Sequence, residues 1–235
     1  MDAVNPVLAG EETVGRVIRG TLDRGCFVPP PGFSTIGHMK LCASALFALF
    51  ACLAATPSID RAKATGNPTA PITIEVFSSF DCPHCKIFHE TVEPELVRDY
   101  VMPGKVYLVK REFPLSGQYH MFAREAAVDA TAAARVGKYE PVADALYKNQ
   151  AAWSMDGKVW QTVASVLTAS DQSKVQALTK EPGVVAEVQQ DYDEGMAGAI
   201  SSTPTIVISF KGKRYPFSGV PNYDLFRKFL DDLLK

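Results

Sequence analysis

The 235-residue sequence predicts an α/β domain with the element order β-α-β, a helical insertion, and then β-β-α. Three observations support this prediction. Two apolar, β-branched segments, 72–77 and 105–113, flank a helical segment that begins at Pro83. A long stretch of helical character, residues 118–200, comes next. Residues 201–235 then show the pattern of a hairpin followed by a helix. The length suits one domain that carries an insertion.

The first three elements are marked by local signals. Residues 72–77 (ITIEVF) are β-branched and aromatic, which is typical of a buried strand. Pro83 fits a first helical turn, where its missing N–H has no partner to lose. Pro94 is expected to kink this helix. A right-handed crossover would make strand 105–113 parallel to the first. The apolar side of the helix consists of Ile87, Phe88, Val92, Leu96 and Val97.

The second half begins with the predicted insertion. Residues 122–136 are Ala-rich, and Trp153 and Trp160 are expected to pack in the core. Further helical pieces are predicted at 142–147, 159–167, 175–178 and 184–196.

The chain then returns to β structure. Residues 205–210 (TIVISF) predict a strand, Gly212 a turn, and residues 214–217 an antiparallel partner. Asn222 is a suitable N-cap for the last helix. That helix repeats Leu225, Phe226, Phe229, Leu230 and Leu233 at helical spacing.

Residues 39–64 have the pattern of a secretory signal peptide. Met39-Lys40 precedes an apolar run over residues 41–55, and Ala62-Lys63-Ala64 offers an A-x-A cleavage site. A cut near Ala54-Ala55 is a second possibility. A retained membrane anchor is the alternative, although the run is shorter than the roughly 20 residues that a spanning helix usually needs. Lipid attachment at Cys52 is a minor alternative.

Residues 1–38 lie upstream of this signal and are rich in Gly, Pro and charge. We interpret them as an over-extended start, with Met39 as the initiator, or else as a cytoplasmic extension. Residues 1–64 are therefore left out of the fold prediction.

The composition limits the function classes. The formal net charge is -2, so no basic excess favours nucleic acid. Cys26, Cys42 and Cys52 lie in the excluded part, which leaves Cys82 and Cys85 in the predicted domain. No bound cofactor is expected beyond a redox-active disulfide formed by this pair.

The segment Cys82-Pro83-His84-Cys85 carries the predicted chemistry. A cysteine between a strand and a helix N-terminus receives free backbone N–H groups and the positive end of the helix dipole. Both lower the pKa of Cys82, which makes it the nucleophile, while Cys85 resolves the mixed disulfide. Pro83 fixes the turn, and His84 is expected to add positive charge near the thiolate.

Other uses of a C-x-x-C pair are less well supported. Zinc requires about four ligands, and only His89 lies nearby as a third. Haem attachment requires a histidine where this chain has Lys86. A disulfide that closes so short a loop adds little stability. Redox catalysis is therefore the preferred interpretation, and no metal is expected.

A second signal is Ser202-Thr203-Pro204-Thr205, directly before the strand 205–210. An X-Pro bond at such a position is either cis or, more commonly, trans.

Together, FSSFDCPHC, REFPL (residues 111–115) and TPT (residues 203–205) resemble the DsbA family, over about residues 68–235. These are bacterial thioredoxin-fold proteins with an inserted helical domain. The resemblance implies that residues 65–117 and 201–235 form the thioredoxin-like domain, and residues 118–200 the insertion. It also implies a cis Pro204 against the active site and a Thr203 backbone that binds incoming peptide.

The family pattern also includes a buried acid on the first strand. Counting back from Cys82 places its counterpart near Val76, whereas this chain has Glu75, one residue away. A one-residue offset on a strand turns the side chain to the other face. Glu75 is therefore a proton-transfer candidate whose alternative is an exposed carboxylate at a strand end.

Three functions remain open from the sequence. The first is a periplasmic or otherwise exported monomeric oxidase, which passes its disulfide to exported proteins and is reoxidised by a quinone-linked membrane partner of the DsbB type. The second is a reductase or isomerase of the same fold. The third is a metal- or peptide-binding module without turnover.

Overall fold

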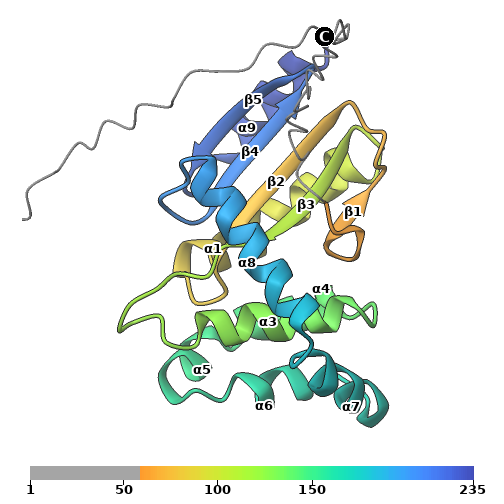
Figure 1. The fold of residues 1–235 in the computed structure, drawn as a ribbon. Helices are drawn as coiled ribbons and strands as arrows, with labels where there is room; N and C mark the ends of the chain where they lie inside the picture. The colour runs from red at the N-terminus through yellow and green to blue at the C-terminus, as the bar shows by residue number, and fades with distance from the viewer. Residues whose placement is uncertain (1–58) are drawn as a thin grey trace, which may run out of the picture. The chain divides into compact units, whose positions relative to one another are not determined.

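A five-stranded mixed sheet forms the centre of the fold in the computed structural model, which describes residues 59–235 (Figure 1). The strand order is β1-β3-β2-β4-β5. The pair β2–β3 is parallel, as predicted, and the other three pairs are antiparallel. The strands are β1 (Ala64–Gly66), β2 (Ile72–Ser78), β3 (Val106–Glu112), β4 (Thr205–Phe210) and β5 (Lys213–Ser218).

Six helices stand between β3 and β4 and form the predicted insertion. In Figure 1, α3 to α7 lie below the sheet, and α8 runs from them back toward it. These helices are α3 (Ala123–Ala134), α4 (Tyr139–Lys148), α5 (Gln150–Asp156), α6 (Val159–Ala164), α7 (Ala169–Leu178) and α8 (Pro182–Ala197). The chain ends in α9 (Tyr223–Leu233), where Asn222 accepts a hydrogen bond from the Leu225 N–H and is the predicted N-cap.

The helix after β2 is continuous but not uniform. Two α-helical segments, α1 (Pro83–Ile87) and α2 (Glu93–Leu96), are each followed by a π-helical turn, Phe88–Val92 and Val97–Val101. Pro94 lies in the first turn of α2, directly after a π-helical turn. The wider turn accommodates the residue without an N–H, since a π bulge leaves a backbone hydrogen bond unmade.

The alternation along β2 assigns its two faces to different helices. Ile72, Ile74 and Val76 are fully buried in a cluster with residues of the α1–α2 helix and of α9, among them Leu96 and Leu230. Phe77 faces the other way and packs with Phe113, Ile200, Val207 and Tyr192 beside α8. The sheet is thus covered on both faces, as a three-layer α/β domain requires.

The folded part begins before residue 65, the boundary expected from the sequence. A 3₁₀ turn, Arg61–Lys63, leads into β1, where Ala64 is opposite Val109 on β3. The Lys63 side chain is buried, with its ammonium 2.6 Å from Asp191 and 2.9 Å from Glu187 on α8. Residues 59–64 therefore belong to the domain. The over-extended start, Met39 and the apolar run 41–55 lie outside the described residues.

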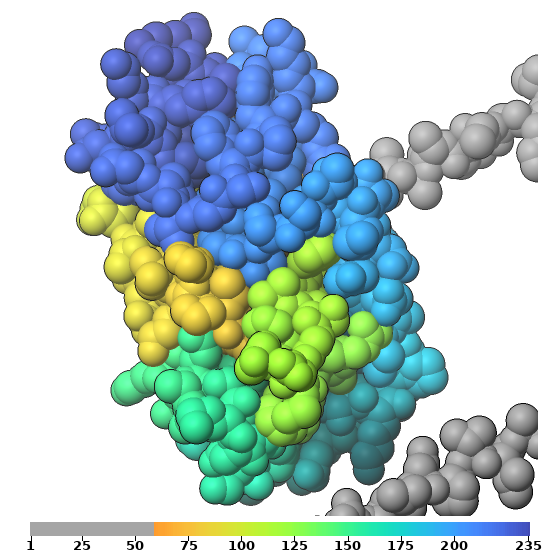
Figure 2. Space-filling view, turned by 90° about the vertical axis from the view of Figure 1, so that its left-hand side faces the viewer, coloured from red at the N-terminus to blue at the C-terminus, as the bar shows by residue number. Residues whose placement is uncertain are grey.

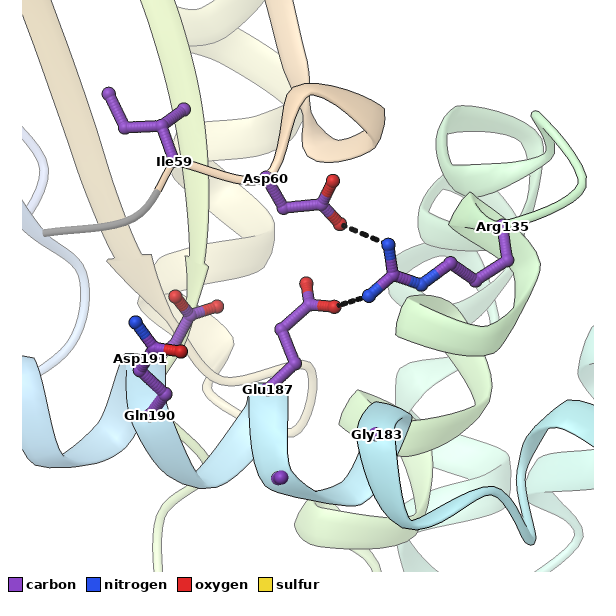
Figure 3. A pocket seen from close by; sticks show the side chains of 8 residues that line it. Ile59, Asp60, Arg135, Gly183, Glu187, Gln190 and Asp191 are labelled. Carbon is purple, nitrogen blue, oxygen red and sulfur yellow. Dashed lines mark hydrogen bonds and ion pairs between the residues drawn. The ribbon is translucent and has the colours of Figure 1, made fainter.

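Figure 3 shows how α3 and α8 hold this N-terminal segment. Arg135, at the end of α3, points between Asp60 and Glu187 and is ion-paired with both.

Across residues 59–235, no helix is long and apolar enough to cross a membrane.

Replacing Lys63 with Met should lower the free energy of unfolding by about 1–3 kcal/mol, because Asp191 and Glu187 would each lose one of their two cations and keep only Arg111 and Arg135. Urea denaturation at neutral pH measures this change. The matched control is Lys228→Met, at an exposed position on α9, which should change stability by less than about 0.5 kcal/mol. Equal stabilities for the two variants would show that Lys63 contributes nothing to folding.

Candidate active site

The predicted redox pair lies at the junction of β2 and α1. Cys82 is the N-cap of α1, and its N–H donates to the Ser79 carbonyl at 3.1 Å. Both thiols are reduced and buried, with Cys82 4% and Cys85 1% exposed. The Cys82 thiol lies 3.3 Å from the carbonyl oxygen of Thr203, and the Thr203–Pro204 peptide bond is cis, as the resemblance implied. The structure therefore brings together residues 121 positions apart.

The two thiols have opposite electrostatic environments. A hydrogen bond from the Cys85 thiol, with smaller contributions from Thr203 and the backbone N–H groups of Cys85 and His84, lowers the pKa of Cys82 to about 5. Burial, together with the neighbouring Cys82 sulfur, raises the pKa of Cys85 far above its usual value. Cys82 is therefore a thiolate at neutral pH while Cys85 keeps its proton. The roles of nucleophile and resolving thiol stay predictions.

His84 contributes to the site through its backbone. Its side chain is exposed, and it is the backbone N–H of His84, at the start of α1, that stabilises the thiolate. The effect predicted for the imidazole charge stays a prediction. Pro83 occupies the first helical position as expected.

Behind Cys85 lies a small polar chamber that sequence reasoning missed. Its volume is about 10 Å³, room for a single water. The Lys110 ammonium is ion-paired with Glu93 there, and Glu112 accepts a hydrogen bond from the Tyr139 hydroxyl at 2.8 Å. The signal was available in the sequence, because Lys110 and Glu112 are charged residues inside the predicted strand 105–113.

The two chamber acids differ in protonation. Burial would raise the pKa of Glu93, but the Lys110 charge and a hydrogen bond with His89 outweigh it and hold that pKa at about 2. Burial raises the pKa of Glu112 to about 7, despite the opposing charge of Lys63. Glu112 is thus the chamber acid that exchanges a proton near neutral pH.

Glu75 is not part of this chamber. It faces the α8 side of the sheet, opposite to Val76, as the one-residue offset predicted. Arg111 donates to its carboxylate at 2.7 and 2.9 Å, and Arg214 lies 3.3 Å away. The alternative of an exposed strand-end carboxylate is wrong, because Glu75 is only 7% exposed. It is a buried ion-pair partner.

Two contacts from the insertion position the segment before Cys82. The Gln150 amide on α5 donates to the carbonyl oxygens of Phe80 at 2.6 Å and Cys82 at 3.0 Å. His120 contacts the buried Asp81 carboxylate at 2.5 Å, which ties the loop after β3 to the active site. In Figure 2, the gold surface around residues 75–85 borders this lime-green loop. Neither contact has a local sequence signal.

The metal alternative finds no assembled ligand set among residues 59–235. Both ring nitrogens of His89 face carboxylates, Asp144 at 2.7 Å and Glu93 at 3.5 Å.

Comparison with known proteins agrees with this geometry. The family model described as Thioredoxin matches residues 60–232. The chain belongs to the thioredoxin family. Within this family it resembles the DsbA-like thiol–disulfide oxidoreductases, and Cys82 and Cys85 have the C-x-x-C spacing.

The relatives are distant but extensive. "Disulfide bond formation protein D" of Bacillus subtilis is 24% identical over 188 residues, which cover 76% of this chain and 80% of that protein. The crystal structure of Wolbachia pipientis alpha-DsbA1 superposes with a TM-score of 0.62 at 23% identity, covering 73% of this chain and 89% of that one. The crystal structure of oxidised BdbD from B. subtilis superposes with a TM-score of 0.60 at 23% identity, covering 76% of this chain and 95% of that one. These structures show that this thioredoxin-family chain has the DsbA-like fold.

Replacing Cys85 with Ala should raise the pKa of Cys82, because the largest stabilising hydrogen bond to the thiolate is removed. Cys85→Ser, which keeps an O–H donor, should leave that pKa closer to 5. Thiolate absorbance and iodoacetamide reactivity as functions of pH measure both values. Identical pKa values in the two variants would assign the stabilisation to the backbone alone.

Replacing Gln150 with Leu should cost about 1–3 kcal/mol of stability, since the buried Phe80 carbonyl loses its donor. The alkylation rate of Cys82 should also change, because the segment Phe80–Cys82 loses its hydrogen bonds from Gln150. Denaturation and thiol alkylation rates measure the two effects. Gln161→Leu, at an exposed position on α6, is the control and should alter neither.

Proposed function

We propose that this protein is a dithiol oxidase that donates the Cys82–Cys85 disulfide to newly exported proteins. The observation that carries the proposal is the asymmetric pair of thiols. Cys82 is stabilised as a thiolate with a pKa of about 5, so the reduced form is favoured and the disulfide is readily passed on.

The exchange proceeds in two balanced steps. A substrate thiolate attacks the Cys82 sulfur, the Cys82–Cys85 bond breaks, and Cys85 leaves as a thiolate that takes up a proton. A second substrate thiolate then attacks the substrate sulfur of the mixed disulfide and displaces the Cys82 thiolate. The substrate loses two electrons to form its disulfide, and the Cys82–Cys85 pair gains them. The low pKa of Cys82 makes it the better leaving group in the second step.

The proton that Cys85 takes up comes from the chamber behind it. Glu112 lines this chamber with Cys85 and has a pKa of about 7, so it can lose a proton to a nascent thiolate and regain it. The Glu93–Lys110 ion pair keeps the chamber polar although it is buried. We therefore transfer the proton-transfer role from Glu75 to Glu112.

The surroundings of the site suit an unfolded polypeptide substrate. Ile87 on α1 and Tyr119 and Met121 in the loop anchored by His120 are exposed, at 45%, 81% and 70%. Apolar groups of this kind contact the side chains that an unfolded chain still exposes. The Thr203 carbonyl beside Cys82 is the acceptor available to the backbone of an incoming peptide.

Turnover requires an oxidant for the reduced pair, and a quinone-linked membrane protein of the DsbB type would supply it. The oxidase would act as a monomer outside the cytoplasm after export. A cleavage near Ala54-Ala55 would keep the buried Lys63 and β1, whereas a cut after Ala64 would remove Lys63 from the core.

The reduction potential tests this function and its pH dependence. It should lie above that of thioredoxin, and its slope should change at the pKa of Cys82. Above about pH 5, reduction consumes two electrons and one proton, so the potential should fall by about 30 mV per pH unit. Below that pH two protons are consumed, and the slope should be about 59 mV. Equilibration with glutathione buffers across this pH range measures both slopes.

The same pKa sets a stability difference between the redox forms. The pKa of Cys82 is lower in the folded than in the unfolded protein, so its stabilisation is present above the unfolded thiol pKa and is lost as pH falls through about 5. The reduced form should therefore be more stable than the oxidised form at neutral pH, with the difference shrinking toward pH 5. A thioredoxin-like potential with a more stable oxidised form would instead identify a reductase. If the Cys85→Ser variant forms no mixed disulfide with a substrate protein through Cys82, the protein is a binding module without turnover.

A further inference from the structure

A second pocket lies in the helical insertion, formed by residues of α3, α6 and the C-terminal part of α7. Its volume is about 510 Å³, within the range of sites that hold small organic ligands. Trp160 on α6 and Val128 on α3 supply apolar lining, and Gln176 supplies an amide. None of the residues that line it belongs to the redox site.

One carboxyl oxygen among the lining residues has no hydrogen-bond partner in the described part of the chain. Asp129 on α3 is 5% exposed, and its Oδ2 atom is buried without a hydrogen bond. Buried polar groups in native proteins almost always have a partner, since an unsatisfied carboxylate costs the desolvation free energy of the charge. Asp129 is among the residues that line the pocket, so it borders the space that a bound molecule would occupy.

The charges around Asp129 make its ionised, unpartnered carboxylate still less favourable. Glu125, one helical turn earlier, is a second acid in the lining, and burial together with the Glu125 charge raises the pKa of Asp129 to about 7. Arg124 also lines the pocket, but its guanidinium donates to Gln189 on α8 at 2.9 Å. The remaining charged lining residue, Lys180 after α7, forms no ion pair with either acid among the described residues and does not contribute to the pKa of Asp129.

We infer that this pocket binds a small organic cation, with an ammonium or amidinium group on Asp129 and Glu125 and an apolar body against Trp160 and Val128. A cation supplies both the missing hydrogen-bond donor and the missing positive charge. The aromatic face of Trp160 adds a favourable surface for the cation or its apolar body. A free small molecule fits better than a basic side chain of another protein, because a single Lys or Arg would leave most of the 510 Å³ empty.

The test is a nuclear magnetic resonance titration of the chain with 2-phenylethylammonium chloride at about pH 8, where Asp129 is mostly ionised. Saturable shifts are expected at the Trp160 indole N–H, assigned with Trp160→Phe, and at α3 amides around Asp129. The neutral isostere 2-phenylethanol should bind about tenfold more weakly or worse, since it brings no charge. The blocked peptide acetyl-Gly-Lys-Gly-amide should also bind more weakly.

Asp129→Asn is the decisive variant, because it keeps the shape of the side chain and removes its charge. It should fold and keep the redox activity of the wild-type chain, but bind 2-phenylethylammonium about tenfold more weakly or worse. The control Asp224→Asn, at an exposed acid on α9, should bind as the wild type does.

Three results would overturn the inference: no saturable shift, equal binding by Asp129→Asn, or equal binding of 2-phenylethanol. Tighter binding of the lysine peptide would assign the pocket to a protein side chain and reject the small-molecule ligand. The redox assay is independent of all these outcomes, so failure here leaves the proposed function untouched.

Discussion

Three consecutive charged residues near the end of β3 impose the constraint on which the rest of the fold depends. Lys110, Arg111 and Glu112 are 8%, 2% and 2% exposed, and a buried charge must be paired because its desolvation is costly. Adjacent residues on a strand face opposite sides, so the partners come from different layers. Lys110 pairs with Glu93 on the α1 side, while Arg111 pairs with Asp191 on α8.

These pairings join the insertion to the sheet. Asp191 accepts from Arg111 at 2.8 Å, from the Glu112 backbone at 3.1 Å and from Lys63 at 2.6 Å, so one carboxylate connects α8, β3 and the N-terminal segment. Tyr139 on α4 donates to Glu112 and thereby places a second helix of the insertion. Ion pairs are geometrically demanding, and a shifted insertion would leave several buried charges without partners.

The same constraint shapes the chemistry of the redox pair. Because β3 pairs with β2, its charged end lies behind the helix that carries Cys85, and the Cys85 thiol borders a polar chamber within an apolar core. Cys82 gains its thiolate character from hydrogen-bond donors at the start of α1, with Thr203 brought alongside by β4. In the proposed oxidase, thiolate stabilisation at Cys82 and proton exchange at Cys85 would therefore be handled by different groups.

The sequence by itself determined those features that local signals encode. The strand alternation, Pro83, the C-x-x-C spacing and the Asn222 N-cap predicted the element order and the redox pair, because each depends on neighbours a few residues away. The tertiary structure alone decided which groups pair with Lys110, Arg111 and Asp81. It also decided the hydrogen bonds from Gln150 to the active-site segment and the burial of Lys63. Lys63 and Asp191 are 128 positions apart, and Gln150 and Phe80 are 70 apart. The residue pattern within a single helix or strand does not indicate such a pairing. The pairing arises only when packing brings two buried groups within hydrogen-bond distance.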